Sequence, residues 1–336
     1  MSTASLAWRI LQTRLTGARV PISVCLELTH RCNAHCSYCE ISRDSREEMN
    51  TAETMMAIDE FRAAGMERLG LTGGEPLLRD DLPEIIRHAR RRGVYVSLNS
   101  NGQLVADQAE RLAGIQTLVL SLNGDDRQHG ETKEGVDFAH VVAAIEWARK
   151  TNLDVMTITT LTGKNLNVVP FVTELARTLG CWCTFQPVLL CGTRVALPAG
   201  LDFDRMEMVR AVDRIIDAKR RGLPVANSWR YLDYFRRFYA TGDVSPPRCP
   251  GGRYIVTVLP DGTVAPCNIQ PTGVTFANGR EVGFVRAFRE MPSFQCESFC
   301  AGPFFELNDV FALRPSAWLN GARVEWRRRR PRCPEV

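Results

Sequence analysis

Between about residues 21 and 190, short apolar runs alternate with longer amphipathic segments. The apolar runs have the length of buried strands and occupy residues 22–28, 68–71, 94–98, 117–120, 153–159 and 181–188. The segments between them have helical spacing and lie near residues 51–65, 81–92, 103–113, 137–151 and 166–179. Continuous apolar strands separated by helices are typical of a parallel sheet covered by helices. The pattern therefore predicts an α/β fold of six β/α units, an incomplete (β/α)6 TIM-like barrel.

Two helix starts carry the spacing of an N-terminal cap. Asn50 precedes Glu53 by three residues, and Asp81 precedes Glu84 in the same way. A polar residue followed three positions later by Glu is the signature of a capping box. We therefore expect helices to begin at both places.

The remainder of the chain predicts a smaller second unit. A charged helix is expected near residues 203–221, and an aromatic helix follows at 229–239, whose rings either form core or line a substrate pocket. Residues 254–267 read as a β-hairpin, since an Asp-Gly pair at its centre is a strong turn signal. We divide the chain into four parts. They are an N-terminal amphipathic arm (1–20), a partial barrel (21–225), a small C-terminal domain containing the hairpin (226–322) and a basic tail (323–336).

Composition limits the functional class. The 336 residues carry a net charge of +4 with both signs mixed, which does not call for nucleic acid. No signal peptide is evident, so the twelve cysteines suit metal ligation in a reducing cytoplasm. The amphipathic arm is expected to dock on the barrel, with weak contact to a membrane surface or a partner as the alternative. The basic tail is expected to be solvated, with binding to an anionic surface as its alternative.

Three cysteines follow the first predicted strand with the spacing C-x3-C-x2-C. Cys32, Cys36 and Cys39 could each bind one iron of a cubane cluster and leave the fourth iron without a protein ligand. An open coordination position on a metal is where chemistry takes place. The alternatives are a zinc site completed by His30 or His35, and three unrelated buried thiols.

This stretch resembles the cluster motif of the radical S-adenosylmethionine (SAM) enzymes. The resemblance implies that the open iron binds SAM, whose reductive cleavage gives a 5′-deoxyadenosyl radical, and that Tyr38 lies near the adenine. A second motif, Gly73-Gly74-Glu75-Pro76, directly follows the next predicted strand and resembles the loop that holds the SAM amino group in this family. The two motifs follow successive predicted strands, and this joint placement supports the resemblance more strongly than either motif alone.

Polar residues follow further strands. The resemblance implies that Ser121, and more weakly Asn123, contact the SAM ribose or carboxylate. Asn99 and Asn101 could do the same or form turn hydrogen bonds. His129, in the charged segment that comes next, is a candidate acid or base, and the alternative is a solvated loop.

A second cysteine set lies in the C-terminal part. Cys249, Cys267, Cys296 and Cys300 surround and follow the hairpin, and Pro260-Asp-Gly-x-Val-x-Pro-Cys267 resembles the auxiliary-cluster modules called SPASM and twitch. Full SPASM modules carry seven cysteines, so the resemblance here implies one auxiliary [4Fe–4S] cluster, as in twitch modules. Four cysteines fit zinc equally well by chemistry.

Five cysteines remain. Cys25 is expected in the core and Cys333 as a free thiol in the tail. Cys181 and Cys183 alternate on one strand, and Cys191 follows that strand. A thiol there could quench a substrate radical or ligate a cluster, with plain burial as the alternative, so Cys183 and Cys191 join His129 as catalytic candidates.

The resemblance implies an oxidoreductase-type radical SAM enzyme with two [4Fe–4S] clusters and an electron donor such as flavodoxin or ferredoxin. Only 31 residues precede Cys32, too few for a leader-binding domain, which favours a small natural-product or sugar-like substrate. The alternatives are a ribosomal peptide and a lipid. The molybdenum-cofactor GTP cyclase is discounted on its different C-terminal cysteine spacing. A non-catalytic metal-binding protein is disfavoured because it needs no Gly-Gly-Glu-Pro loop.

Overall fold

All six apolar runs form strands of one sheet. In the computed structural model, residues 3–44, 46–151, 153–188, 201–242, 249–268, 273–294 and 299–319 are described. The six strands run parallel and in chain order. They are β1 (Ser23–Thr29), β3 (Arg68–Gly73), β4 (Tyr95–Ser100), β5 (Thr117–Ser121), β7 (Asp154–Leu161) and β8 (Trp182–Pro187).

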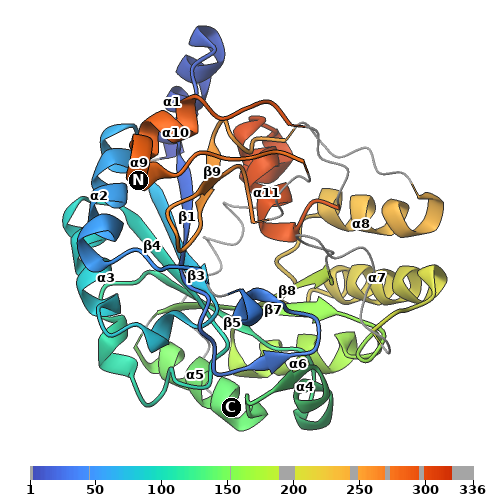
Figure 1. Ribbon diagram of the computed structural model, residues 1–336. Coiled ribbons are helices and arrows are strands. Elements are labelled where there is room, and N and C mark those ends of the chain that lie inside the picture. The colour runs from blue at the N-terminus through green and yellow to red at the C-terminus, as the bar shows by residue number, and fades with distance from the viewer. Residues whose placement is uncertain are drawn as a thin grey trace.

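Helices follow the strands and cover one face of the sheet (Figure 1). They are α2 (Thr51–Ala63), α3 (Leu82–Arg91), α5 (Phe138–Lys150), α6 (Val169–Leu179) and α7 (Arg205–Arg220). The capping box predicted at Asn50 and Glu53 is confirmed. A helix also begins after Asp81, its N-cap, but the capping box predicted there is wrong, because the Asp81 carboxylate instead accepts hydrogen bonds from Arg79 and Thr51, at 2.6 and 2.7 Å.

The helix predicted at residues 103–113 is also wrong. That segment consists of turns and one short 3-10 helix, η3 (Ala109–Leu112). Leu112 and Val105 are buried there, so the apolar positions that suggested a helix anchor an irregular loop instead. Two further short 3-10 helices, η1 (Ile41–Arg43) and η2 (Pro76–Leu78), follow the first two strands of the barrel.

The sheet continues past the six predicted β/α units. β9 (Ile255–Val258) pairs in parallel with β1, and β10 (Val264–Ala265) pairs antiparallel with β9, which confirms the hairpin. The strand order is β10-β9-β1-β3-β4-β5-β7-β8, so within the described residues β10 and β8 are the two edges and the barrel is open. The boundary near residue 225 stays a prediction, and the sheet contains strands from both sides of it.

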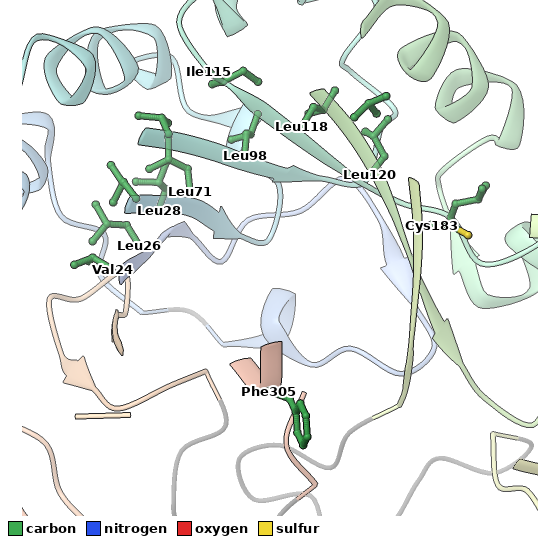
Figure 2. Close-up of a cluster of buried hydrophobic side chains, with 14 of the residues drawn as sticks. Val24, Leu26, Leu28, Leu71, Leu98, Ile115, Leu118, Leu120, Cys183 and Phe305 are labelled. Carbon is green, nitrogen blue, oxygen red and sulfur yellow. The ribbon is translucent and has the colours of Figure 1, made fainter. Parts of the chain in front are cut away.

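The two faces of the sheet differ in burial. Val24, Leu26, Leu28, Leu71 and Leu98 are fully buried and lie on the helix-covered face (Figure 2). The residues that alternate with them face the inside of the barrel and are mostly half-buried, as along β7 and β8. This inner face is called the lumen below, and its side chains along β7 and β8 are less buried than those under the helices.

The aromatic helix is α8 (Trp229–Thr241), and it packs on α7 and on α11 (Gly302–Phe311). Tyr231, Tyr234 and Phe235 are buried, so the core alternative holds for these rings, while Trp229 is half-exposed. α11 lies on the open side of the barrel, near β8 (Figure 1). Two short helices, α9 (Gly279–Val282) and α10 (Phe284–Arg289), link the hairpin to α2.

The N-terminal arm is a helix, α1 (Thr3–Thr16). It docks through Ile10 on a small apolar cluster with Tyr254 and Phe311, as expected, while Trp8 and Leu15 are 64% and 79% exposed. Contact of this exposed side with a membrane surface stays a prediction. Among the described residues, no helix combines the length and apolarity that crossing a bilayer requires.

Candidate active site

The loop that carries Cys32, Cys36 and Cys39 leaves β1 at the carboxyl-terminal edge of the sheet. Two residues of this loop form β2 (His35–Cys36), which pairs with β6 (Lys133–Glu134) so that Cys36 lies opposite Lys133. The Ser37 backbone N–H also donates to the Thr132 carbonyl oxygen at 3.1 Å. The cysteine loop is thus fastened to a segment about 100 residues further along the chain.

The Gly73-Gly74 pair lies directly against the start of the cysteine loop. The Gly74 N–H donates to the Thr29 carbonyl at 2.7 Å, and the Glu75 N–H donates to the Arg31 carbonyl at 2.8 Å. A Cβ on Gly73 would lie 2.2 Å from the Thr29 oxygen, and one on Gly74 2.2 Å from the Arg31 oxygen. Only glycine permits so close an approach, so the two predicted motifs form one structural unit.

Glu75 is fully buried, and protein groups surround its carboxylate. It accepts hydrogen bonds from the Ser100 hydroxyl at 3.0 Å, the Asn101 N–H at 2.8 Å and the Leu77 N–H at 3.1 Å. Burial raises the pKa of Glu75 above its usual value, although these donors oppose the shift. The side chain therefore braces the loops after β3 and β4, and its contact with an amine stays a prediction.

Hydrogen-bond donors also reach the first cysteine. Cys32 Sγ accepts from the Ala34 N–H at 3.4 Å and from Asn101 Nδ2 at 3.9 Å. Burial raises the pKa of the Cys32 thiol, and these donors act in the opposite direction. N–H groups directed at sulfur stabilise a thiolate and are typical of cluster ligands. Asn101 also accepts the Gln103 N–H at 2.9 Å, which is the turn hydrogen bond left open for it, and its contact with SAM stays a prediction.

Lys133 is a site residue that the sequence did not reveal. It is only 2% exposed, and burial lowers its pKa, while the negative charges of Cys36, Glu75, Cys32 and Cys39 raise it. A buried lysine is stable only with such partners. The three thiols and Glu75 therefore share one buried cation, which would also attract the carboxylate of a ligand.

Lys133 was missed because residues 125–134 appeared to be a solvated charged loop. That expectation is wrong: the segment folds into α4 (Asp126–Thr132) and β6, and the Asp125 side chain caps the helix at the Gln128 N–H. The aspartate before a short helix was the available signal.

His129 lies inside this helix and is fully buried. Its Nδ1 accepts from the Asn123 N–H at 3.2 Å, and burial lowers its pKa to about 3. The ring is therefore neutral and held in one orientation. An acid or base role for His129 stays a prediction that this geometry disfavours, because a neutral imidazole with so low a pKa is a poor proton acceptor.

Asn123 connects Tyr38 to the barrel. Its Nδ2 donates to the Tyr38 hydroxyl at 2.9 Å and to Thr132 at 3.2 Å, and its Oδ1 accepts from the Thr160 N–H at 3.1 Å. Asn123 is fully buried and holds the Tyr38 hydroxyl in place, and its contact with SAM stays a prediction. Ser121, by contrast, is half-buried on the lumen side, and Asn99 is exposed there beside Thr72.

Comparison with known proteins agrees with this geometry. The profile described as "Radical SAM superfamily" matches residues 26–175. A protein named PqqA peptide cyclase from Xanthomonas oryzae pv. oryzae is 31% identical over 288 residues, covering 80% of this chain and 74% of the relative. The chain belongs to the radical SAM superfamily. A PqqA peptide cyclase from Rhodopseudomonas palustris is 28% identical over 279 residues.

Solved radical SAM structures share the fold. SuiB of Streptococcus suis bound to its precursor peptide SuiA superposes with a TM-score of 0.69, covering 84% of this chain and 68% of that one, at 14% identity. A second structure, anSMEcpe with bound AdoMet and a peptide, gives a TM-score of 0.63 at 18% identity, over 80% of each chain. The open α/β barrel predicted from the sequence is confirmed.

As a radical SAM enzyme, the protein uses a [4Fe–4S] cluster and SAM. The first cysteine loop fits a cubane better than a single ion. Zinc needs four ligands around one point, and His30, one of the two histidines that could complete the site, is instead bonded to Glu27 and to the Asp44 carbonyl. A cubane instead binds each thiolate to a different iron, which lets the three sulfurs lie further apart around Lys133.

The second cysteine set is only partly described. Cys249 is exposed and Cys267 half-buried, and a Cβ on Gly251 would lie 3.2 Å from Cys249 Sγ and 3.0 Å from the Pro266 carbonyl oxygen. Cys249 therefore lies near the chain just before Cys267. Cys300 directly follows Phe299, whose ring packs on the aromatic helix α8. The Cys300 N–H donates to the hydroxyl of Tyr234, a residue of α8, at 3.1 Å. Cys296, Cys191 and Cys333 lie outside the described residues.

Two other cysteines are placed. Cys183 is fully buried, and its Sγ donates to the Pro224 carbonyl at 3.4 Å. Burial raises its pKa strongly, as does the nearby charge of Cys181. Cys183 therefore matches the burial alternative, and a catalytic role for it stays an unsupported prediction. Cys25 faces the lumen, where burial first, and then Glu27, raise its pKa to about 12.

Proposed function

We propose that this radical SAM enzyme modifies a peptide. The observation that carries the proposal is the 31% identity to a PqqA peptide cyclase over 80% of the chain. The likeness to SuiB and anSMEcpe, both solved with peptides, concerns the fold alone at 14–18% identity. The sugar-like or aminocyclitol substrate expected from the short N-terminal arm is accordingly replaced by the peptide alternative.

The first site supplies the reactive chemistry. When bound, the cluster and SAM provide a 5′-deoxyadenosyl radical that takes a hydrogen atom from a substrate C–H bond. Cys32, Cys36 and Cys39 would hold the cluster, with Ala34 and Asn101 donating to the Cys32 sulfur. Gly73 and Gly74 keep the neighbouring loop against the cysteines. Tyr38, oriented by Asn123, would lie by the adenine.

Lys133 gives the site its charge selectivity. The three cysteines and Glu75 act electrostatically on its ammonium, and the β2–β6 pairing places Lys133 opposite Cys36. We assign the SAM carboxylate to Lys133, with Ser121 as a hydroxyl donor on the lumen side. A charge-assisted hydrogen bond in a buried site contributes about 1.5–3 kcal/mol.

The lumen would receive the substrate residue. The ends of its strands carry hydroxyl and amide groups together with apolar ones, and most are half-buried. Active sites of β/α barrels lie at this carboxyl-terminal edge, where loops after the strands reach the ligand. A single side chain of a peptide, rather than a folded protein, suits an inner face of this kind.

An auxiliary [4Fe–4S] cluster belongs to the same proposal. Cys249, Cys267, Cys296 and Cys300 are its proposed ligands, in keeping with the PqqA peptide cyclase relatives. It would accept an electron from the substrate radical, which would make the overall reaction an oxidation. The ligands must be thiolates, so we expect the enzyme to work in a reducing cytoplasm with a flavodoxin or ferredoxin as electron donor.

The test uses the anaerobically reconstituted full chain with SAM and dithionite. The probes are synthetic peptides encoded by short open reading frames beside the gene, deuterated at their side chains, and, in parallel, a panel of aminocyclitols and hexoses. We expect deuterium in 5′-deoxyadenosine and a mass change in one peptide. Consumption of an aminocyclitol or hexose with every peptide unchanged would contradict the proposal of a peptide substrate. Failure to cleave SAM would contradict the proposed radical SAM activity itself.

A further inference from the structure

The segment that carries Cys300 is anchored by an aromatic cluster on α8 and α11. The Tyr234 ring stacks between Phe299 and Phe305, with centroid separations of 4.9 and 5.0 Å and interplanar angles of 23° and 25°. Figure 2 shows Phe305 set apart from the apolar residues of the strands. Tyr231 contacts the same two phenylalanines, at 6.1 and 5.5 Å. These rings therefore fix the backbone on both sides of a proposed cluster ligand.

Two tyrosine hydroxyls from this cluster reach the Cys300 segment. The Tyr234 oxygen accepts the Cys300 N–H at 3.1 Å. The Tyr231 hydroxyl lies over Gly302, since a Cβ there would be 3.5 Å from its oxygen. Tyr231 is fully buried, and within the described ranges its hydroxyl has no hydrogen-bond partner. Leaving a buried hydroxyl unpaired is unfavourable, so an acceptor is expected close by.

Two acceptors adjoin the residues that Tyr231 contacts. The Cys300 sulfur belongs to the residue between Phe299, whose ring contacts Tyr231, and Gly302, which lies under the Tyr231 hydroxyl. The Glu306 carboxylate belongs to the residue after Phe305, whose ring also contacts Tyr231. A phenol hydroxyl can donate to either of them.

Glu306 is the less suitable of the two. Its carboxylate already accepts the Ser228 N–H at 2.6 Å, and burial raises its pKa to about 7, so it is partly neutral under working conditions. A thiolate bound to iron keeps its negative charge and accepts hydrogen bonds.

We propose that Tyr231 donates a hydrogen bond to the Cys300 sulfur when Cys300 ligates the auxiliary cluster, and that this bond raises the reduction potential of that cluster. The inference rests on the proposed function, because it requires the auxiliary cluster and Cys300 as its ligand. An added electron increases the negative charge on the sulfurs, so a donor at one sulfur stabilises the reduced state more than the oxidised state. Tyr231 is thus a positioning and tuning residue for electron transfer from the substrate radical.

The experiment removes this one hydroxyl from a chain that holds only the auxiliary cluster. The background carries Cys32→Ala, Cys36→Ala and Cys39→Ala together, and Tyr231→Phe is added to it. Tyr239→Phe is the matched control, because Tyr239 is a half-buried tyrosine on the same helix whose ring also contacts Phe299, with a centroid separation of 6.2 Å. Iron content, the reduction potential by EPR-monitored titration, and the deuteron coupling after exchange into D2O are measured.

About four irons per chain in the background establish the auxiliary cluster. We then expect Tyr231→Phe to shift the potential to a more negative value and to remove one exchangeable deuteron coupling, while Tyr239→Phe changes neither. An unchanged potential and coupling in Tyr231→Phe would overturn this inference alone and favour Glu306 as the acceptor. A background chain without iron would overturn both the auxiliary cluster and the inference.

Discussion

The two cysteine sites of this enzyme are supported in different ways. The first is anchored by main-chain bonds from Gly74 and Glu75 after β3 and from the β2–β6 pairing, with one side-chain bond from Asn101 after β4. In the second, Cys249 is exposed, and the described anchors of Cys300 are side chains of α8. The first site is thus preorganised by the sheet itself, whereas in the second Cys267 follows β10 and the Cys300 segment is attached through an aromatic cluster.

This difference matches the tasks that we propose for the two sites. A site that must orient SAM to within a fraction of an ångström benefits from rigid main-chain support. A site that passes an electron needs proximity and a suitable potential, which side chains around the sulfurs can adjust. Mutations near the first site should therefore affect geometry and activity together, and those near the second should affect the potential.

The largest effect is expected from Gly74→Ala. The new Cβ would lie 2.2 Å from the Arg31 carbonyl oxygen, so the main chain before Cys32 must move. We expect SAM cleavage to be abolished and the free energy of unfolding to fall by about 3 kcal/mol or more. Gly130→Ala is the control, since a Cβ there meets nothing within 4 Å. 5′-Deoxyadenosine formation and chemical denaturation measure both effects, and wild-type activity in Gly74→Ala would refute the anchoring of the first site.

Lys133→Met tests the buried cation of the first site. Removing the ammonium leaves the three thiols and Glu75 without their shared positive charge. We expect SAM affinity to fall about 10- to 100-fold, which corresponds to the loss of roughly 1.5–3 kcal/mol. Lys164→Met, an exposed lysine whose Nζ donates to the Glu131 carbonyl, should bind SAM normally. Calorimetric titration of the reconstituted proteins with SAM measures the affinity. Equal SAM affinities of Lys133→Met and wild type would contradict the assignment of Lys133 to the SAM site.

Cys183→Ala separates burial from catalysis. The Cys183 side chain is buried in the core, and its thiol donates to the Pro224 carbonyl. Its removal should therefore lower the free energy of unfolding by about 1–2 kcal/mol. Peptide turnover and 5′-deoxyadenosine yield should stay at wild-type levels. Normal stability combined with lost product formation would restore Cys183 as a catalytic candidate.

The smallest effect concerns the ion pairs that link the two regions. Arg46 pairs with Asp44 after the first loop at 2.7 Å and with Asp261 in the β9–β10 turn at 2.9 Å. Burial alone would raise the pKa of Asp261, but hydrogen bonds from Thr263 and Arg46 hold it below its usual value. Its stabilisation is thus complete above the unfolded pKa of about 3.9 and is lost as the pH falls through the lower folded value.

Asp261→Asn should therefore be less stable than wild type by about 0.5–1 kcal/mol at pH 7, with the difference becoming smaller as the pH is lowered to 2. Urea unfolding at both pH values measures it. A difference that persists at pH 2 would mean that Asp261 acts through something other than its charge.

The sequence predicted the features that depend on local pattern. The six strands were found because each is a short apolar run, and the two motifs because their residue types are tied to one chemistry. The helix near residues 103–113 was wrong because Val105 and Leu112 anchor a loop with the spacing of a helix. Lys133 was missed because a lysine among charged residues indicates solvent, and only the pairing with β2 buries it.

The pairing of β9 with β1 has a consequence for biogenesis. During synthesis, β1 emerges first, and its outer edge lacks its partner until a segment some 230 residues later has left the ribosome. An open strand edge of this kind invites pairing with other chains. The nascent enzyme therefore spends most of its translation with the strand that leads into Cys32 unprotected, and truncation before residue 255 should yield aggregates rather than a smaller working barrel.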